Sequence, residues 1–353
     1  MVIKLLLIFI ILFLRYISRL NRHKIFYYKQ EQRYHIFVWS LIVLMAAFRG
    51  INVGADTIGY LYDYRILPTM SFEDIAYRYE GYLGYFYTSK IFSLMAMPHW
   101  IWFGFVEALY AISLAKLTSR YSQDKLFSVL VFVTIGLFSF SMAGMKQVMS
   151  MSLVNFAFLS FLDKKYLRTI ILFIYAYTCH PTSLVFLGVI PIYLLRNKSY
   201  YTIALLSVLV LIVTNSFLFL SSMVSLLGNE HFETYLDYDN SYSSTTLYLY
   251  VLITLIASIG FKAYLKRDKE NFRFLLGLSL VVIALQTLSG ISPNMFRLAL
   301  FYAPFLMFLI PNSCKNMPAN FKTVIQLAVI AVLVLYYLYT GRNTPYTFLT
   351  NLL

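Results

Sequence analysis

Four basic side chains stand at the ends of four separate apolar segments of this chain: Arg49, Lys146, His180 and Arg297. One membrane topology places all four on the same side, where a ring of cations suits an anionic group carried by a lipid. Guanidinium groups hold phosphate oxygens in bidentate fashion, so two arginines and a lysine match a pyrophosphate better than a single charge would. His180 precedes Pro181, which favours a helix end there, and its imidazole can take a proton from a hydroxyl near neutral pH.

Carboxylates and tyrosines near these cations add a second chemistry. The segment "FRGINVGADTIGYLYDY" (48–64) contains Asp56, which is expected to cap a short helix running through Tyr60 and Tyr64. Asp56 and Glu80 are the outer carboxylates that we expect to act as a base or to orient a sugar hydroxyl. Aromatic rings beside carboxylates suit carbohydrate, so Tyr60 and Tyr64 are expected to bind substrate. Anchoring at the membrane interface explains many tyrosines equally well.

Each of these residues also has a plain structural interpretation. Arg49 and Arg297 could extend to lipid headgroups. Lys146 could be an ordinary loop lysine, and His180 a structural hydrogen bonder. Glu107 lies inside an apolar segment, where a charged carboxylate is costly. It is expected either to pair with one of the arginines or to be a proton site of a transporter.

The composition indicates a membrane protein. The chain has 353 residues, of which 60% are hydrophobic and only 12% are charged, whereas soluble domains are about a quarter charged. We predict an all-α polytopic integral membrane protein, a single domain over 1–353, with about 12 transmembrane helices of roughly bilayer length. The apolar N-terminus has no small-residue cleavage site and is expected to stay as the first span. The predicted spans are 2–18, 35–50, 99–117, 126–143, 149–162, 167–180, 182–195, 201–220, 247–262, 274–290, 296–311 and 323–340.

Basic residues set the predicted orientation. Most of the 29 lysines and arginines fall in loops that share one face, and the positive-inside rule makes that face cytoplasmic. Both termini and two larger loops, about 51–98 and 221–246, then lie outside. The segment 82–97 is apolar but is interrupted by Lys90, and a crossing there would move later basic loops outward. We therefore expect it to lie on, or dip into, the outer surface.

Several chemistries have no signal in the sequence. There is no Walker loop, no GxGxxG, no HExxH and no Asp-rich cluster that would hold Mg²⁺ against a phosphate. Metal-independent chemistry without a cofactor is the simpler expectation. Cys179 and Cys314 fall near opposite faces and have no metal-ligand spacing, so neither a disulfide nor a metal site is expected. The basic loops fit a topology signal, so nucleic acid is not an expected partner.

Five motifs are similar to those of a known family: "FRGINVGADTIGYLYDY" (48–64), "YEGYLG" (79–84), "GMKQVMSMSL" (144–153), "CHPTSL" (179–184) and "SPNMFRL" (292–298). Through them the chain resembles the EpsG-like branch of Wzy-type oligosaccharide repeat-unit polymerases. These are bacterial enzymes of O-antigen, capsule and exopolysaccharide assembly. Lys146 stands where the resemblance leads us to expect arginine, and lysine keeps the charge but loses the planar fork.

The resemblance implies glycosyl transfer at the outer face of the bacterial cytoplasmic membrane, by a chain similar to GT-C-like membrane glycosyltransferases. Donor and acceptor would both be glycans on undecaprenyl pyrophosphate, with a flippase and a chain-length regulator as further partners. An acceptor hydroxyl would attack the donor's anomeric carbon, and polyprenyl pyrophosphate would leave. Arg49, Arg297 and Lys146 would stabilise the leaving group. His180 would be the general base.

Two other functions stay open at this stage. A lipid-linked oligosaccharide flippase or other transporter fits about twelve spans. It would, however, show ionisable residues and broken helices near mid-membrane, where only Glu107 is clearly deep. Another surface-glycan transferase, such as an O-antigen ligase or an acyltransferase, suits the same cations. Product analysis separates polymerase from ligase, because loss of a polymerase leaves single repeat units on the final carrier and loss of a ligase leaves none.

Overall fold

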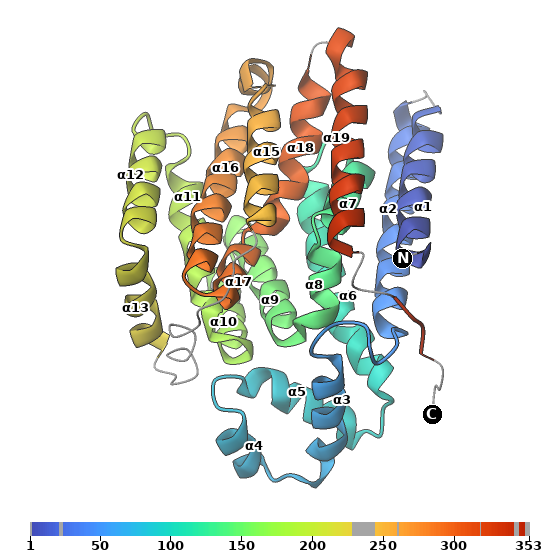
Figure 1. Ribbon diagram of the computed structural model, residues 1–353, viewed down its shortest axis with the longest axis vertical. Coiled ribbons are helices and arrows are strands. Elements are labelled where there is room, and N and C mark those ends of the chain that lie inside the picture. Colours follow the sequence, from blue (N-terminus) through green and yellow to red (C-terminus); the bar gives the residue numbers. More distant parts are fainter. Residues whose placement is uncertain are drawn as a thin grey trace. The chain divides into compact units, whose positions relative to one another are not determined.

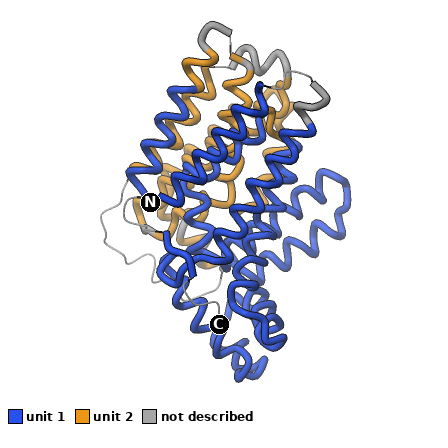
Figure 2. The backbone as a smooth tube through the Cα atoms, turned by 90° about the vertical axis from the view of Figure 1, so that its right-hand side faces the viewer, with its two compact units in different colours: residues 1–120, 124–183, 327–353 blue, residues 121–123, 184–326 orange. Residues whose placement is uncertain are grey.

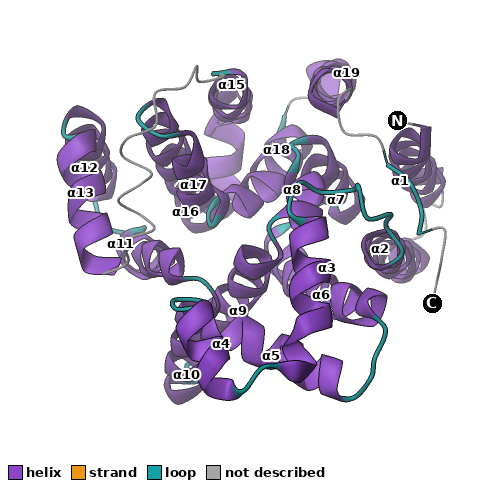
Figure 3. Ribbon diagram, turned by 60° about the horizontal axis from the view of Figure 1, so that its bottom comes forward, coloured by secondary structure: helices purple, strands orange, loops and turns teal. Residues whose placement is uncertain are grey.

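Helices joined by turns and short loops make up nearly all of the described chain (Figure 1), and Figure 3 shows them by secondary structure. The computed structural model describes residues 2–20, 24–227, 244–259, 261–317, 319–341 and 346–349. Within those residues the one β interaction is an isolated antiparallel bridge between Arg49 and Phe348. The prediction of an all-helical chain is confirmed.

The chain divides into two compact units, which Figure 2 colours separately. The first comprises residues 1–120, 124–183 and 327–353, and the second comprises 121–123 and 184–326. The single domain expected from the sequence stays a prediction. Most of the expected outer loop at 221–246 lies outside the described residues.

The first unit contains the N-terminal helices, the central ones and most of the last one. In it α1 packs on α2 and α7, α9 packs along α10, and α10 also contacts α5, so stretches far apart in the sequence share one core. Its helices are α1 (Val2–Leu20), α2 (Lys24–Ala47), α3 (Thr57–Ile66), η1 (Leu67–Thr69), α4 (Phe72–Arg78), α5 (Leu83–Leu94), α6 (His99–Tyr121), α7 (Lys125–Thr134), α8 (Leu137–Ala143), α9 (Met145–Leu162), α10 (Tyr166–Cys179) and α19 (Ala319–Gly341).

The second unit is built around α16, which packs against α11, α12, α15, α17 and α18. The short helix η2 (Pro181–Gly188) leads into it. Its other helices are α11 (Val189–Leu195), α12 (Tyr201–Thr214), α13 (Ser216–Leu227), α15 (Thr245–Ile259), α16 (Phe261–Thr287), η3 (Leu288–Gly290), η4 (Pro293–Met295), α17 (Phe296–Leu300), η5 (Ala303–Phe305) and α18 (Leu306–Asn316).

Four helical stretches of the described chain are long and apolar enough to cross a membrane: His99–Tyr121, Met145–Leu162, Asp268–Gly290 and Lys322–Gly341. The pair α7 and α8 would add a fifth if it forms one bent span. Each of these overlaps a predicted span, which is consistent with a membrane protein. Four more predicted spans correspond to apolar helices of 10–17 residues, and the predicted span 296–311 is divided among α17, η5 and α18, so length and composition alone do not establish twelve crossings.

The predicted span 126–143 is not one straight helix. It breaks after Thr134, and α7 and α8 meet at an angle of 58°. Gly136 lies at the break with a φ of 91°, a left-handed conformation that only glycine adopts without steric cost. This glycine allows the bend, although the hydropathy of residues 126–143 predicts one continuous span.

The predicted outer loop 51–98 is largely helical, and a buried lysine holds it together. Lys90 Nζ donates to the Leu67 carbonyl at 2.9 Å and also to the Met70 carbonyl, so it satisfies acceptors where α3 and η1 end. The basic residue that interrupts segment 82–97 is therefore a structural bridge. The helix in that segment, α5, has 12 residues, and about 20 are needed to cross a bilayer. Its expected position at the outer surface stays a prediction.

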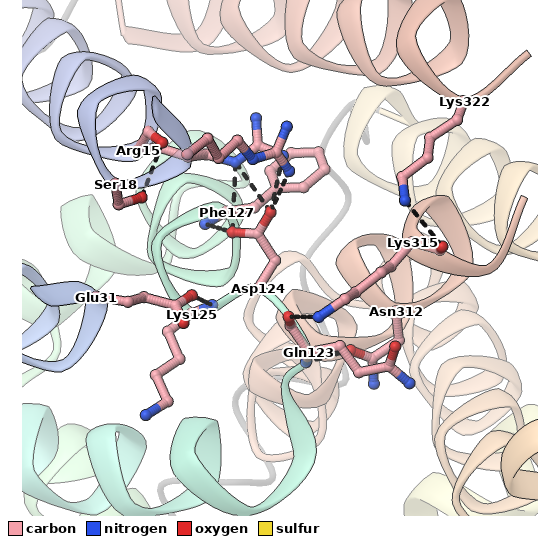
Figure 4. A network of polar contacts seen from close by, with 11 residues as sticks. Arg15, Ser18, Glu31, Gln123, Asp124, Lys125, Phe127, Asn312, Lys315 and Lys322 are labelled. Atoms are coloured by element: carbon pink, nitrogen blue, oxygen red, sulfur yellow. Dashed lines mark hydrogen bonds and ion pairs between the residues drawn. The ribbon is translucent and has the colours of Figure 1, made fainter. Parts of the chain in front are cut away.

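A buried carboxylate fixes the start of α7 (Figure 4). Asp124 is the N-cap, and its Oδ1 accepts from the Phe127 N–H at 3.1 Å. Its other oxygen pairs with Arg15 at 2.9 Å and with Arg19 at 2.7 Å. Burial alone raises the pKa of Asp124, but the charges of Arg15 and Arg19 and these hydrogen bonds hold it below its usual value. The carboxylate thus ties α1 to α7.

Figure 4 also contains a group of polar contacts that belongs to the second unit. The Gln123 N–H donates to Asn312 Oδ1 at 2.7 Å, and Asn312 Nδ2 donates to the Tyr121 carbonyl at 2.7 Å. Lys315 Nζ donates to the Gln123 carbonyl, also at 2.7 Å. Backbone groups just beyond a helix end are satisfied in this way by side chains of α18.

Candidate functional site

Arg49 lies two residues beyond the end of α2 and is only 3% exposed. Its Nη1 donates to the Ala46 carbonyl at 2.6 Å, and its Nη2 lies 3.1 Å from Met145 Sδ. The guanidinium carbon lies 4.3 Å from the centroid of the Phe103 ring, a cation–π contact. The side chain is therefore enclosed by protein, not extended to lipid headgroups, and it joins α2, α6 and the start of α9.

The segment after Arg49 reaches α8 because it contains a glycine. Gly54 has a φ of 89°, and a Cβ on it would lie 2.8 Å from the Met142 carbonyl carbon. No side chain fits there. Thr57 Oγ1 then donates to the Val53 carbonyl at 2.5 Å and accepts from Arg49 Nε at 3.4 Å. Gly54 thus allows the loop that follows Arg49 to pack against the Arg49 side chain.

Lys146 and His180 contact the same aromatic ring, that of Tyr82. The Lys146 ammonium lies 4.0 Å from the ring centroid, and the His180 imidazole meets the ring edge-on at 5.4 Å between centroids. Lys146 and Tyr82 are half-buried, and His180 is buried. Since Lys146 follows Met145, which touches Arg49, one connected set of contacts links Arg49, Lys146, Tyr82 and His180 in the first unit.

His180 ends α10 in an extended conformation, with φ of −161° and ψ of 110°. The following proline disfavours a helical conformation at this residue, as the sequence predicts. Its Nδ1 shares a hydrogen bond of 2.6 Å with Thr182 Oγ1. That bond fixes the orientation of the imidazole. Its partner, Thr182, belongs to the same "CHPTSL" motif as His180.

Gly84 lets α5 approach the end of α10. A Cβ on this residue would clash with Thr178 Oγ1 and would lie 3.0 Å from Cys179 Sγ. The close approach brings Tyr82, at the N-cap of α5, to His180, just beyond Cys179. The sequence analysis did not identify Tyr82, which begins the segment 82–97 that was expected at the outer surface. The available signal was its place between two glycines in "YEGYLG".

The predicted carboxylates and tyrosines differ in their surroundings. Asp56 occupies the N-cap position of α3, but its side chain makes no capping bond, and both Asp56 and Glu80 are exposed. Tyr60 is buried against Tyr85, with 5.7 Å between ring centroids. Tyr64 is buried, and its hydroxyl donates to the Met97 carbonyl at 2.6 Å. Burial raises the pKa of Tyr64 to about 12, so its phenol stays neutral. Substrate contact by these four residues stays a prediction.

Arg297 belongs to the second unit, where it lies in α17 and is half-buried. The other three basic side chains, Arg49, Lys146 and His180, belong to the first unit. The ring of four that the sequence predicts, including Arg297, stays a prediction.

Glu107 is buried on α6, one turn beyond Phe103, and accepts from Ser141 Oγ at 3.1 Å. Among the ion pairs formed by described residues, none includes Glu107. Pairing with an arginine, one of its two expected roles, is therefore not seen at contact distance. Its nearest polar partner is a hydroxyl of α8, the helix whose carbonyl also faces Gly54.

The segment 346–349 lies antiparallel to the chain around Arg49. The Gly50 N–H donates to the Thr347 carbonyl at 2.7 Å, and the Leu349 N–H donates to the Phe48 carbonyl at 2.9 Å. Tyr346 is buried, and its hydroxyl donates to the Met45 carbonyl. The C-terminal segment helps to enclose Arg49.

No metal site is evident in the described part of the chain, since no group of three or more His, Cys, Asp and Glu side chains is placed to hold an ion. Cys179 and Cys314 are both buried free thiols. Metal-independent and cofactor-free chemistry stays a prediction.

Comparison with known proteins gives one decisive match: the model of the EpsG family covers residues 32–351. The chain belongs to the EpsG family. The match includes every residue of the candidate site and nearly the whole chain, so the resemblance predicted from the five motifs is confirmed. No curated protein and no solved structure matches. Membership of the EpsG family implies a membrane protein with glycosyltransferase-like polymerase activity related to exopolysaccharide.

Proposed function

We propose that this EpsG-family protein polymerises oligosaccharide repeat units carried on undecaprenyl pyrophosphate, at the outer face of the cytoplasmic membrane, for a surface polysaccharide. The observation that supports this most is the connected set of Arg49, Lys146, Tyr82 and His180. These residues come from four segments of the chain and gather cations beside an aromatic ring. Cations suit a departing diphosphate, and an aromatic ring suits the face of a sugar.

The reaction is a substitution at the anomeric carbon of the donor glycan. A hydroxyl oxygen at the non-reducing end of the acceptor forms the new glycosidic bond, and the bond from the anomeric carbon to pyrophosphate breaks. Polyprenyl pyrophosphate leaves with the bonding electron pair. In this scheme His180 accepts the hydroxyl proton at Nε2, and Thr182 Oγ1, which lies 2.6 Å from Nδ1, accepts from Nδ1–H in the tautomer that a general base needs. Asp56 or Glu80 orients the acceptor or takes the place of the base.

The cations stabilise charge on the leaving group. Lys146, half-buried in the first turn of α9, is the direct contact in this scheme. Arg49 uses three of its five N–H donors within the protein, which leaves two for a phosphate oxygen, and its contact with Met145 places it beside the residue that precedes Lys146. Arg297 supplies the third cation.

The proposal extends to the membrane arrangement. The protein crosses about twelve times, in the manner of GT-C-like transferases, with the short apolar helices counted among its crossings. The loops rich in lysine and arginine face the cytoplasm. A flippase supplies the lipid-linked units, and a chain-length regulator acts on the product. The chemistry needs neither a metal nor a cofactor.

The test is chain length of the polysaccharide in cells that express single variants at matched protein level. Lys146→Met and Arg297→Met should each lower polymerisation about 100-fold, the usual effect of removing one stabilising donor. Arg65→Met removes an exposed cation of α3 that touches none of these residues, and it should leave chain length unchanged. Normal chains in Lys146→Met would remove Lys146 from the mechanism. A product that lacks even single repeat units would indicate a ligase.

A further inference from the structure

Helices α2 and α6 leave an apolar groove between them, entirely within the first unit. Its volume is about 630 Å³. Ala108, Ala111 and Ala115 recur at spacings of three and four on α6, so they share one face, and their short side chains leave the space. On the rim Ile36 and Ile112 are about half exposed, at 55% and 49%. An apolar, open groove of this kind on a membrane helix pair fits a lipid chain.

One end of the groove is polar. Gln32 and His35 from the first half of α2 meet Lys116 and Ser119 from the last turns of α6 there. Apart from Ser40, the other lining side chains are hydrophobic. Lys116 is exposed, and no acidic residue lines the groove. This polar end of the groove lies near basic loops that the sequence predicts on the cytoplasmic face.

His35 has a donor that the described chain leaves without an acceptor. The ring is 0% exposed, and Trp39 Nε1–H donates to its Nε2 at 2.9 Å. A nitrogen that accepts carries no proton, so the neutral ring carries its proton on Nδ1. Within the described residues Nδ1 has no hydrogen-bond partner. Because buried donors are nearly always paired, an acceptor from outside the protein is expected in the groove.

We propose that this groove is a binding site for one glycerophospholipid with a net negative headgroup, of the phosphatidylglycerol type. An acyl chain lies along the three alanines, and the phosphate lies at Lys116, with Gln32 and Ser119 as further polar contacts. An ester carbonyl accepts from His35 Nδ1–H. A zwitterionic headgroup is disfavoured, because its ammonium finds no carboxylate on the groove wall.

The site is separate from the proposed catalytic one. His35 lies 12 residues before the end of α2, or roughly 18 Å along the helix axis, whereas Arg49 follows that end. The lipid site is therefore expected on the other leaflet from the glycan chemistry, and it does not depend on the proposed polymerase function.

Trp39 lines the groove and provides the measurement. The full-length protein is placed in phosphatidylcholine nanodiscs that contain a series of mole fractions of dibrominated phosphatidylglycerol or dibrominated phosphatidylcholine. Bromine quenches tryptophan on contact. The Trp39 signal is the difference between wild type and Trp39→Phe, since the chain has two other tryptophans.

The expected result is a preference of about fivefold for the anionic lipid, since one basic side chain near an anionic membrane surface contributes roughly 1 kcal/mol. Lys116→Gln should reduce the preference to about one, and Lys165→Gln, an exposed lysine outside the groove, should leave it unchanged. Ala115→Leu should weaken quenching by both lipids, because it fills the groove.

Four results would overturn the site. Equal quenching by the two lipids would mean ordinary bilayer contact. Absence of quenching by either would mean that protein, such as a second copy of the chain, covers the groove. Stronger competition by unlabelled undecaprenyl phosphate than by unlabelled phosphatidylglycerol would assign the groove to the carrier lipid. An unchanged preference in Lys116→Gln, with a normal size-exclusion profile, would equally contradict the proposal.

Discussion

Tyr82 is the residue whose replacement tests the site most directly, because two proposed functional groups rest on one ring. Tyr82→Leu removes the surface under the Lys146 ammonium and the edge contact with His180. Tyr82→Phe keeps both contacts and removes only the hydroxyl. The two variants therefore separate the contribution of the aromatic ring from that of the hydroxyl.

The size of the effect follows from the two contacts. A cation 4.0 Å from a half-buried ring contributes about 1 kcal/mol. An edge-on ring pair contributes about 1 kcal/mol more. If both groups act in the transition state, their sum of about 2 kcal/mol corresponds to a loss of roughly 30-fold in rate. Tyr82→Phe should stay within about threefold of the wild type.

The assay follows release of polyprenyl pyrophosphate by the purified protein from a lipid-linked repeat unit, with thermal unfolding as the control for folding. A structural role alone would lower stability and the amount of active protein, but not the rate per folded molecule. The reasoning is refuted if Tyr82→Leu reacts at the wild-type rate per folded molecule. It is equally refuted if Tyr82→Phe is as slow as Tyr82→Leu.

Three further substitutions, with Gly59→Ala as a control, test the packing of the first unit, each by the free energy of unfolding in mixed micelles. Gly84→Ala should cost about 1–3 kcal/mol because its Cβ crowds α10, whereas Gly59→Ala, with no atom within 4 Å, should be neutral or slightly stabilising. Asp124→Asn should cost about 3 kcal/mol, because it leaves buried Arg15 without its counter-charge. Since the pKa of Asp124 is lowered in the folded state, that difference should be constant above a pH of about 4 and disappear as the pH falls further. Lys90→Met should cost about 1–3 kcal/mol, because carbonyl groups that end α3 and η1 lose their donor, and hydrogen exchange in that region should accelerate.

The helices could be predicted where apolar length is the signal. The predicted spans 2–18 and 99–117 correspond to α1 and α6, because an apolar run of bilayer length can form few structures other than a helix. The break at Gly136 could not be predicted, since a glycine inside a helix is often tolerated and its φ depends on tertiary packing. Hydropathy likewise read 201–220 as one span, where the structure separates α12 from α13 at Asn215.

The residue types of the site could be predicted, but their surroundings could not. The sequence identified Arg49, Lys146 and His180 as cations at segment ends, and the structure brings them into one unit. It did not show that Arg49 is buried, because burial depends on how the glycine-containing loop folds back. Tyr82 was hidden among many aromatic residues, since composition does not say which ring faces a cation. The Tyr64 hydroxyl donates to the Met97 carbonyl within the predicted outer loop 51–98, a contact that no local pattern reveals.

Two buried arginines of the first unit, Arg15 and Arg49, differ in how their charges are compensated. Arg15 and Arg49 are 7% and 3% exposed, so each carries the cost of removing a charge from water. Arg15 has its carboxylate, Asp124, at 2.9 Å. Arg49 has a carbonyl, a thioether, a hydroxyl and a ring, and no described carboxylate forms an ion pair with it. Hydrogen bonds and a ring compensate a buried charge only in part. The charge of Glu107 acts favourably on Arg49, but only from beyond ion-pair distance. A buried arginine without a carboxylate in contact suits a place where an anion arrives during function, and the diphosphate leaving group of the proposed reaction is an anion of that kind.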